Sequence, residues 1–544
     1  MNASELLVET LSSSGVENVF GIPGNSLLDS TDYIFKTQRL RFITVRHEQV
    51  AASMAEGYAR VTRVPGVCFA GAGPSAANLL IGVANAYRAS TPMIAVTGNL
   101  EREKLGRGSL NEWNQMEMFG PITKVNVQLT DPARLPDEVR SALLASVSGR
   151  PGPVHLDLPA DVGRKEVEPL GRMSRLEFGP TRAEPPAEQV RKTLDLLRAA
   201  ERPVLIAGGG AFASGAGFRL RRLAELLQIP VGIGSARGIL SEDHPLCFGP
   251  VGVWGYSACN DLVGSADLIV GLGFRFADDS TMGWKTIARD SKIVQVDIDL
   301  TEIGKQYDVT LGVVSDVDTF LNQLLRALKE DATKQRTGWP PQRLKALQSS
   351  LAEERESLVS GPFEDEPVDK RVILREVMRA LGEDAYVVAG TGVHTRYASR
   401  MIVRQPGHFL RSGAFAAMGF AFPAAMGVKV AKPQSQVVCL DGDGDFMMTV
   451  QDFETAVREN LPFVTVVFNN SSYAAYKFAR FRGRRVGVEF GNPDFVRLAQ
   501  SFGGIGERVT RSADFGPTLK RLMDAGEPAI LDALVTNETD LPWY

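Results

Sequence analysis

Short runs of apolar, mostly β-branched residues alternate along the chain with stretches that carry apolar residues at helical spacing. Examples of the short runs are "GVCFAGAG", "PMIAVTG", "PVLIAGGG", "QVVCLDGDG" and "PFVTVVFNN", and most of the runs end in Gly, Asp or Asn. Continuous apolar runs of this kind are typical of strands buried on both faces of a parallel sheet. The pattern predicts an α/β protein of doubly wound parallel sheets, with ligands bound beyond the carboxyl ends of the strands.

Two charged, proline-bearing stretches interrupt this pattern at residues 164–188 and 329–369, and a helix is predicted within the second. We expect both stretches to be linkers, which divide the chain into domains at residues 1–163, 189–328 and 370–544. A chain of 544 residues is long enough for about three domains of ~150–200 residues each.

The composition is that of an ordinary globular protein, with 44% hydrophobic and 23% charged residues and a net charge of −4. This charge gives no general attraction to nucleic acid or to a membrane surface, and neither is an expected partner. Four scattered cysteines without a CxxC pair argue against a disulfide framework and fit a reducing compartment. The N-terminus lacks the apolar core of a signal peptide, and no apolar run approaches ~18 residues, so we expect a cytoplasmic protein.

The candidate chemistry lies in "DGDGDFMMTVQDFETAVRENLPFVTVVFNNSS", residues 441–472. Asp443 follows one predicted strand and Asn470 follows the next, and the carboxyl ends of parallel strands lie at one sheet edge. Both side chains offer oxygen to Mg²⁺ or Ca²⁺, ions that often take few protein carboxylates and complete their shell with phosphate and water. Gly442 and Gly444 let the backbone approach a phosphate closely. The stretch indicates a metal-clamped diphosphate, and a polar turn followed by an Asn-rich turn is the alternative.

GDG followed at this distance by NN resembles the motif of thiamine-diphosphate (ThDP) enzymes. The resemblance covers essentially the whole chain and is closest to the acetolactate synthase group, through stretches such as "VRHEQVAASMAEGYAR", "AGPSAANLLIGVANAYRASTPMIAVTG", "GRPGPVHLDLPADV" and "MGFAFPAAMG". It implies that residues 1–163 form the pyrimidine-binding domain, residues 189–328 a middle domain and residues 370–544 the diphosphate-binding domain.

By this resemblance, Mg²⁺ is bound by Asp443, by the side chain of Asn470 and by the backbone carbonyl of Ser472. "GTGVHT" matches the diphosphate-binding turn of the family, although His394 could instead be a solvated loop residue. The implied cofactor-binding residues of these turns are Val393, His394, Gly442, Gly444 and Asp445.

Glu48 in "RHEQVAASM" matches the glutamate that hydrogen-bonds the pyrimidine nitrogen of ThDP and promotes the imino tautomer, which can remove the thiazolium proton. From the residues alone, Glu48 could equally be a helix-start acid stabilised by the helix dipole. Met418 matches the residue that props the cofactor into a V shape, with an ordinary core methionine as the alternative, and the carbonyl of Ala416 should meet the exocyclic amine. In the family these groups come from two subunits, which implies a homodimer or homotetramer with active sites at the interfaces.

The sequence departs from the acetolactate synthase pattern at three places. Leu110, Asn111 and Glu112 stand where the family has Phe-Gln-Glu, Ala479 replaces a tryptophan, and Asp279 replaces the arginine that binds the second substrate's carboxylate. An aspartate would repel that carboxylate, whereas an arginine would bind it through two hydrogen bonds.

The departures weaken the expectation of acetolactate formation but leave the ThDP chemistry intact. A nearby segment is rich in cations, and it could contact an additional anionic group of the substrate or simply form a solvated lid or subunit contact. Its basic residues are Lys477, Arg480, Arg482, Arg484 and Arg485.

The expected function is therefore ThDP- and Mg²⁺-dependent decarboxylation of a 2-oxo acid, with transfer of the aldehyde-level fragment to an acceptor carbonyl. The alternative is a ThDP-dependent decarboxylase or lyase for another, more anionic 2-oxo acid, and the non-enzyme alternative is a silent ThDP-binding subunit. "AGGGAFASG" in the middle segment leaves bound FAD open, because many relatives have this domain without flavin.

Overall fold

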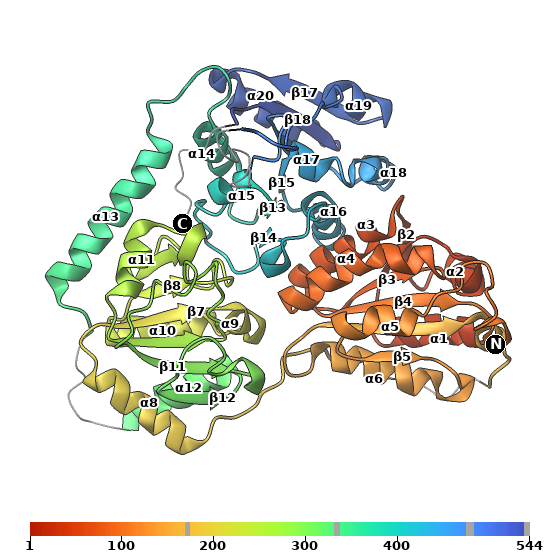
Figure 1. Cartoon of the computed structure of the whole chain (residues 1–544), viewed down its shortest axis with the longest axis horizontal. Helices are drawn as coiled ribbons and strands as arrows, with labels where there is room; N and C mark the ends of the chain where they lie inside the picture. The colour runs from red at the N-terminus through yellow and green to blue at the C-terminus, as the bar shows by residue number, and fades with distance from the viewer. Residues whose placement is uncertain (169–173, 331–337, 475–483, 538–544) are drawn as a thin grey trace.

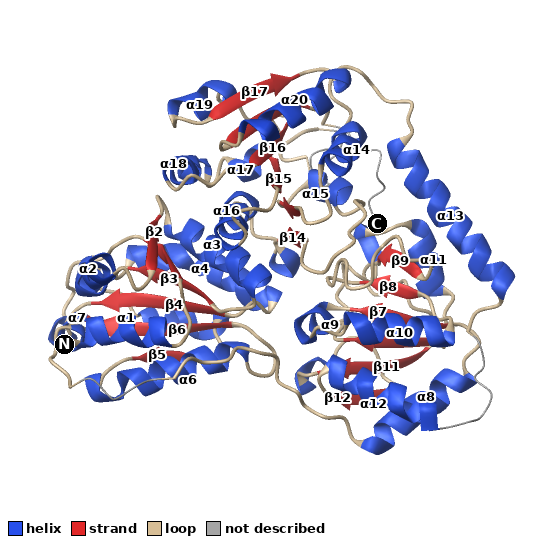
Figure 2. Ribbon diagram, turned by 180° about the vertical axis from the view of Figure 1, so that it is seen from behind, coloured by secondary structure: helices blue, strands red, loops and turns tan. Residues whose placement is uncertain are grey.

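The computed structural model describes residues 1–168, 174–330, 338–474 and 484–537. Within these residues, the strands form three six-stranded sheets in which all pairs of neighbouring strands are parallel (Figure 1, Figure 2). Helices cover both faces of each sheet, so the predicted α/β class with three doubly wound sheets is confirmed.

The first sheet has the strand order β2-β1-β3-β4-β6-β5. Its strands are β1 (Asn18–Gly21), β2 (Arg41–Thr44), β3 (Gly66–Ala70), β4 (Met93–Asn99), β5 (Asn126–Gln128) and β6 (Pro153–Pro159). The helices are α1 (Ala3–Ser13), α2 (Leu28–Thr37), α3 (Glu48–Thr62), α4 (Pro74–Ala89), α5 (Gln115–Phe119), α6 (Leu135–Val147) and α7 (Ala160–Gly163).

The middle sheet has a different order, β12-β11-β10-β7-β8-β9. Its strands are β7 (Pro203–Ala207), β8 (Val231–Ile233), β9 (Cys247–Pro250), β10 (Leu268–Leu272), β11 (Lys292–Asp297) and β12 (Leu311–Val314). The helices are α8 (Ala187–Ala199), α9 (Gly209–Ser214), α10 (Gly217–Leu227), α11 (Ser257–Gly264) and α12 (Val317–Glu330). The helix expected between residues 329 and 369 is α13 (Pro341–Val359), which runs along the outside of the molecule to the third sheet (Figure 1).

The third sheet, β14-β13-β15-β16-β18-β17, repeats the strand order of the first. Its strands are β13 (Tyr386–Ala389), β14 (Phe409–Arg411), β15 (Val437–Gly442), β16 (Val464–Asn469), β17 (Ile505–Val509) and β18 (Ala529–Leu534). The helices are α14 (Lys370–Ala380), α15 (Val393–Ala398), α16 (Ala421–Ala431), α17 (Asp443–Phe446), α18 (Phe453–Arg458), α19 (Phe495–Ser501) and α20 (Ser512–Ala525).

The first and third sheets share one hydrophobic core, in which α3 packs against α16. Two glycines make this close packing possible: a Cβ on Gly57 would overlap the backbone of Ala424, and a Cβ on Gly427 would overlap that of Met54. The contact brings the N-terminus of α3 next to the loop that precedes α16. Among the described residues, none of the helices combines the length and apolarity that crossing a lipid bilayer requires.

Candidate active site

Asp443 and Asn470 lie together at the carboxyl edge of β15 and β16, which are neighbouring parallel strands. Asp443 is 2% exposed, and its Oδ2 accepts hydrogen bonds from the backbone N–H groups of Asn470 (3.0 Å) and Ser471 (2.6 Å). Its Oδ1 accepts from the N–H of Gly444 at 2.8 Å. Burial raises the pKa of the Asp443 carboxyl, and the surrounding hydrogen bonds oppose that rise by stabilising the charged form.

Three residues that offer oxygen atoms lie next to one another here, because Asn470 bonds to Asp443 and Ser472 bonds to Asn470. Asp443 Oδ1 and Asn470 Oδ1 each accept one hydrogen bond from the described residues, so both oxygens keep a lone pair for a metal. Ser472 is adjacent, because its N–H donates to Asn470 Oδ1 at 3.1 Å, and its carbonyl accepts from Ala474 at 2.9 Å. The donor set of carboxylate, amide and backbone carbonyl suits Mg²⁺.

Asn492 is a further member of the site that sequence reasoning missed. Its Nδ2 donates to Asp443 Oδ2 at 2.8 Å and to Asn469 Oδ1 at 2.9 Å, so it ties the ends of both strands together. The only sequence signal was the position of Asn492 in "GNPDFVRLA", just before α19.

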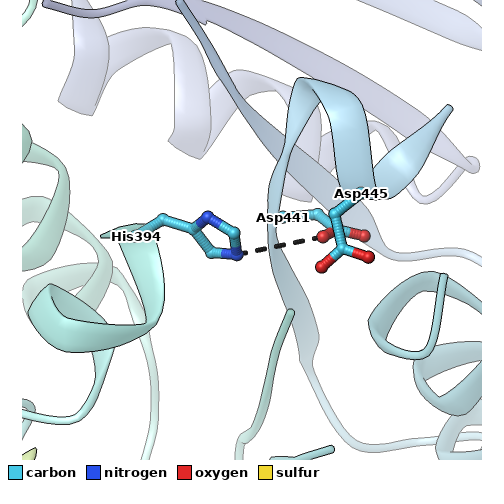
Figure 3. A group of neighbouring side chains, drawn as sticks. All are labelled: His394, Asp441 and Asp445. Carbon is cyan, nitrogen blue, oxygen red and sulfur yellow. Dashed lines mark ion pairs between the residues drawn. The ribbon is translucent and has the colours of Figure 1, made fainter. Parts of the chain in front are cut away.

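His394, Asp441 and Asp445 form a buried cluster beside this edge (Figure 3). His394 Nε2 lies 3.9 Å from Asp441 Oδ1, and Asp445 accepts hydrogen bonds from the backbone N–H groups of Thr391 and Gly419. Burial lowers the pKa of His394 to about 3, so its imidazole is neutral at pH 7. Burial, together with the charge of Asp445, raises the pKa of the Asp441 carboxyl well above its usual range.

The cluster supports the turn at residues 390–392 that precedes α15. A Cβ on Gly390 would overlap the Asp441 and Asp445 carboxyls, so glycine is needed for this close approach. His394 Nε2 and Asp441 Oδ2 are buried without a hydrogen-bond partner among the described residues. Such atoms are uncommon in native proteins, and a bound polar group at the turn would satisfy the imidazole. Val393 begins α15 at this turn, where first-turn N–H groups face away from the helix.

Glu48 begins α3 and is 6% exposed. Two side chains from α4 orient its carboxylate: Ser75 Oγ donates to Glu48 Oε1 at 2.5 Å, and Asn78 Nδ2 donates to Oε2 at 2.9 Å. Sequence reasoning did not single out Ser75 or Asn78, although both lie in "AGPSAAN", where α4 begins after β3.

The helix of Glu48 contacts the loop that contains Ala416 and Met418. Gln49 Nε2 donates to the carbonyl oxygen of Met418 at 3.0 Å, and Thr391 Oγ1 donates to that of Ala417 at 3.2 Å. Ala416 has a positive φ of 54°, an uncommon conformation for a residue other than glycine. The structure therefore brings together, within one chain, the N-terminus of α3, this loop and the turn at residues 390–392.

The positions that depart from the family pattern lie in two places. Leu110 is 87% exposed, Asn111 has a positive φ of 64°, and Glu112 accepts backbone hydrogen bonds that lower the pKa of its carboxyl. Asp279 lines a cavity of about 400 Å³ where all three domains meet, as do Gly208, Gly209 and Gly210 of the glycine-rich turn.

Of the basic segment, Arg484 and Arg485 fall within the described residues. Lys477, Ala479, Arg480 and Arg482 lie outside the described residues. Arg484 is exposed, and Arg485 Nη2 donates to Ser472 Oγ at 2.5 Å, next to the oxygen-rich site.

Three family models for thiamine pyrophosphate enzymes match the chain, and each matches a segment that contains strands of a different sheet. The N-terminal TPP binding domain matches residues 1–118, the central domain residues 190–324 and the C-terminal TPP binding domain residues 390–533. The chain therefore belongs to the thiamine pyrophosphate enzyme family.

Curated relatives narrow this class. A probable acetolactate synthase large subunit of Methanococcus aeolicus is 35% identical over 98% of this chain and 92% of its own length. That of Methanocaldococcus jannaschii is 34% identical over 100% and 93%, and the acetolactate synthase large subunit of Corynebacterium glutamicum is 32% identical over 99% and 88%. The chain is a ThDP-dependent enzyme of the acetolactate synthase type.

Proposed function

We propose that this enzyme decarboxylates a 2-oxo acid with ThDP and Mg²⁺ and transfers the aldehyde-level fragment to an acceptor carbonyl. The observation that supports this most is the convergence of Asp443 and Asn470 at the carboxyl edge of two neighbouring strands. Acetolactate formation is the reaction named for the relatives. We propose it as the first reaction to test.

Separate groups of residues would bind the metal ion and the diphosphate. Asp443, Asn470 and the carbonyl of Ser472 would hold Mg²⁺, and the turn containing Val393 and His394 would bind the diphosphate. His394 would act as a neutral hydrogen-bond donor, because burial keeps its pKa near 3. Gly442 and Gly444 permit close backbone approach, while Asp445 holds the turn through the N–H of Thr391.

Glu48 would hold a proton at the pyrimidine ring nitrogen, with Ser75 and Asn78 fixing the direction of its carboxylate. Met418 would support the V shape of the cofactor, and the carbonyl of Ala416 would accept a hydrogen bond from the exocyclic amine of the cofactor. When bound, ThDP supplies a nucleophilic carbon and an electron sink for the loss of CO₂. The protein then contributes orientation, charge placement and the exclusion of water.

The second candidate is a decarboxylase or lyase for another 2-oxo acid. Asp279 and the exposed Leu110 favour this alternative, because both depart from the acetolactate synthase pattern. Bound FAD also remains a proposal: the cavity lined by residues 208–210 reaches all three domains, and a yellow purified protein with flavin absorption would establish it.

The assembly is expected to be a homodimer or homotetramer, and the location cytoplasmic. Exposed apolar side chains near the site, including Phe415, Met447 and Met448, support burial against a second subunit. Light scattering of the purified protein would measure the size of the assembly.

A panel of 2-oxo acids tests the function. Purified protein with ThDP and Mg²⁺ should release CO₂ from at least one acid, and mass spectrometry should identify a carboligation product. Pyruvate that yields acetolactate would support the first reaction. An aldehyde as the sole product would favour the decarboxylase, and no CO₂ from any acid would contradict both.

A further inference from the structure

Arg411 lies at the edge of the candidate site. It is the last residue of β14 and pairs in parallel register with Ala389, which directly precedes the turn at residues 390–392. The loop that follows Arg411 leads to Ala416 and Met418. Arg411 is therefore one strand away from the turn expected to bind the diphosphate, on the same carboxyl edge of the sheet.

Two other arginine side chains, Arg60 and Arg237, lie near Arg411, and both use all three of their guanidinium nitrogens in hydrogen bonds. Arg60 donates to Glu56, to Thr91 and to the carbonyl oxygen of Arg411. Arg237 donates to both carboxylate oxygens of Glu242 and to two backbone carbonyls.

Arg411 differs from both. Among the described residues, its guanidinium makes no hydrogen bond, and its ion pair with Asp279 has an Nη2–Oδ2 distance of 3.8 Å, beyond hydrogen-bond length. Asp279 is committed elsewhere, since its Oδ2 accepts from Trp254 Nε1 at 2.6 Å and its Oδ1 from Ser280 Oγ at 3.1 Å. The Arg411 Cζ atom lies 4.5 Å from the centroid of the Trp254 ring, a contact that leaves the N–H donors of the guanidinium available to a ligand.

The guanidinium is mostly withdrawn from water, with 18% of the side chain exposed, and it lines the 400 Å³ cavity together with Asp279. A buried cation with unused donors is costly unless an anion completes its shell. A guanidinium binds a carboxylate through two parallel N–H···O bonds, a stronger arrangement than neutral hydrogen bonds. The nearby charge of Asp279 would repel a dianion such as phosphate more than a single carboxylate.

From this geometry we infer that Arg411 binds the carboxylate of a monoanionic 2-oxo acid, and that Asp279 tunes this affinity and disfavours dianionic substrates. The inference rests on the proposed function and assigns its substrate-binding cation to the C-terminal sheet. Asp279 taken alone suggests repulsion of the carboxylate, and the facing arginine supplies the attraction.

Trp254 provides a readout that does not require catalysis. Propanoate, an unreactive carboxylate, should change the fluorescence of the cofactor-free protein, and neutral propanamide should not. The signal should disappear in Trp254→Phe, which identifies its source among the five tryptophans. Arg411→Gln should raise the apparent Kd for propanoate about tenfold or more, because a charge-assisted hydrogen-bond pair is lost. Asp279→Asn should lower the Kd, and Arg404→Gln, which removes an exposed arginine paired with Asp243, should leave it unchanged.

Kinetics then separate substrate binding from a merely structural bridge between domains. In Arg411→Gln the KM of the 2-oxo acid should rise about tenfold with a smaller change in kcat. In the double variant Asp279→Arg/Arg411→Gln the KM should return most of the way to the wild-type value. Arg411→Lys, which keeps the charge, should fall between the wild type and Arg411→Gln.

Two results would overturn the inference: a propanoate Kd that is unchanged in Arg411→Gln, or weaker propanoate binding in Asp279→Asn. If the wild type turns over no 2-oxo acid while propanoate binding still depends on Arg411, the proposed function fails and the carboxylate site stands. If turnover occurs with an unchanged KM in Arg411→Gln, the carboxylate site alone fails.

Discussion

The carboxylate of Asp443 accepts a hydrogen bond from the backbone N–H of Asn470 at 3.0 Å, across 27 residues of chain. The N–H of Ser471 and the amide of Asn492 donate to the same oxygen, so Oδ2 is held from three directions. Oδ1 accepts one hydrogen bond, from the N–H of Gly444 at 2.8 Å, and so keeps a lone pair for a cation. A carboxylate fixed in this way loses little conformational freedom when it binds a cation.

Asn492→Ala should weaken Mg²⁺ binding in the presence of ThDP by about tenfold or more, because residues that orient a metal ligand typically contribute 10–100-fold to affinity. Mg²⁺ titration of activity, or of ThDP binding, measures this effect. Gln500→Ala, which truncates an exposed amide on the following helix α19, is the matched control. Equal Mg²⁺ dependence in both variants would exclude a supporting role for Asn492.

Ser75→Ala should lower kcat about tenfold, with little change in the Kd of ThDP. The hydroxyl contributes a hydrogen bond of 2.5 Å to the Glu48 carboxylate, and a hydrogen bond to a charged group is worth about 1.5–3 kcal/mol. Steady-state kinetics and cofactor titration check the two parts separately. Ser75→Thr keeps the hydroxyl and should recover most of the activity, whereas equal loss in both variants would point to packing instead.

Glu48→Gln should lower kcat by about 100-fold or more while ThDP still binds. The change keeps the size of the side chain but removes the charge, and a positioned acid or base commonly contributes 10²–10⁴-fold. Turnover and ThDP titration on the same preparation give the result. Near-normal turnover would remove Glu48 from the mechanism, and loss of ThDP binding would assign it a binding role instead.

The stability of the N-terminal domain should fall as the pH drops below about 6.5, through His155. Its two ring nitrogens lie 2.7 Å from Thr97 Oγ1 and Asn126 Oδ1, and burial lowers its pKa from 6.5 to about 3. The unfolded chain therefore binds a proton below pH 6.5 that the folded chain does not bind until about pH 3. Each pH unit in this window costs up to about 1.4 kcal/mol.

Urea unfolding of wild type and His155→Gln at pH 7 and pH 5 isolates this contribution. The loss of stability between the two pH values should be smaller in the variant by about 2 kcal/mol, whatever the variant's stability at pH 7. An identical loss in both proteins would mean that His155 is protonated in the folded state.

The sheets and the Asp443–Asn470 pair could be predicted from sequence because apolar strand periodicity and the geometry of neighbouring parallel strands are local rules. The supporting contacts could not. Asn492 reaches Asp443 across 49 residues, and Asn78 reaches Glu48 across 30, through packing that no local pattern encodes.

Asp279 shows the same limit most clearly. Its partners Trp254 and Arg411 come from other parts of the chain, and Arg411 belongs to a different sheet. From the sequence, Asp279 is an isolated negative charge, and its pairing appears only when the domains are assembled.

Calorimetric titration of the cofactor-free protein with ThDP, with and without Mg²⁺, tests the central claim most directly. The wild type and the exposed-site control Asp524→Ala should bind ThDP tightly only with Mg²⁺, and Asp443→Ala should lose at least about 100-fold in affinity, more than a supporting residue would cost. ThDP binding in Asp443→Ala that matches the wild type, or that does not depend on Mg²⁺, would contradict the assignment of this site.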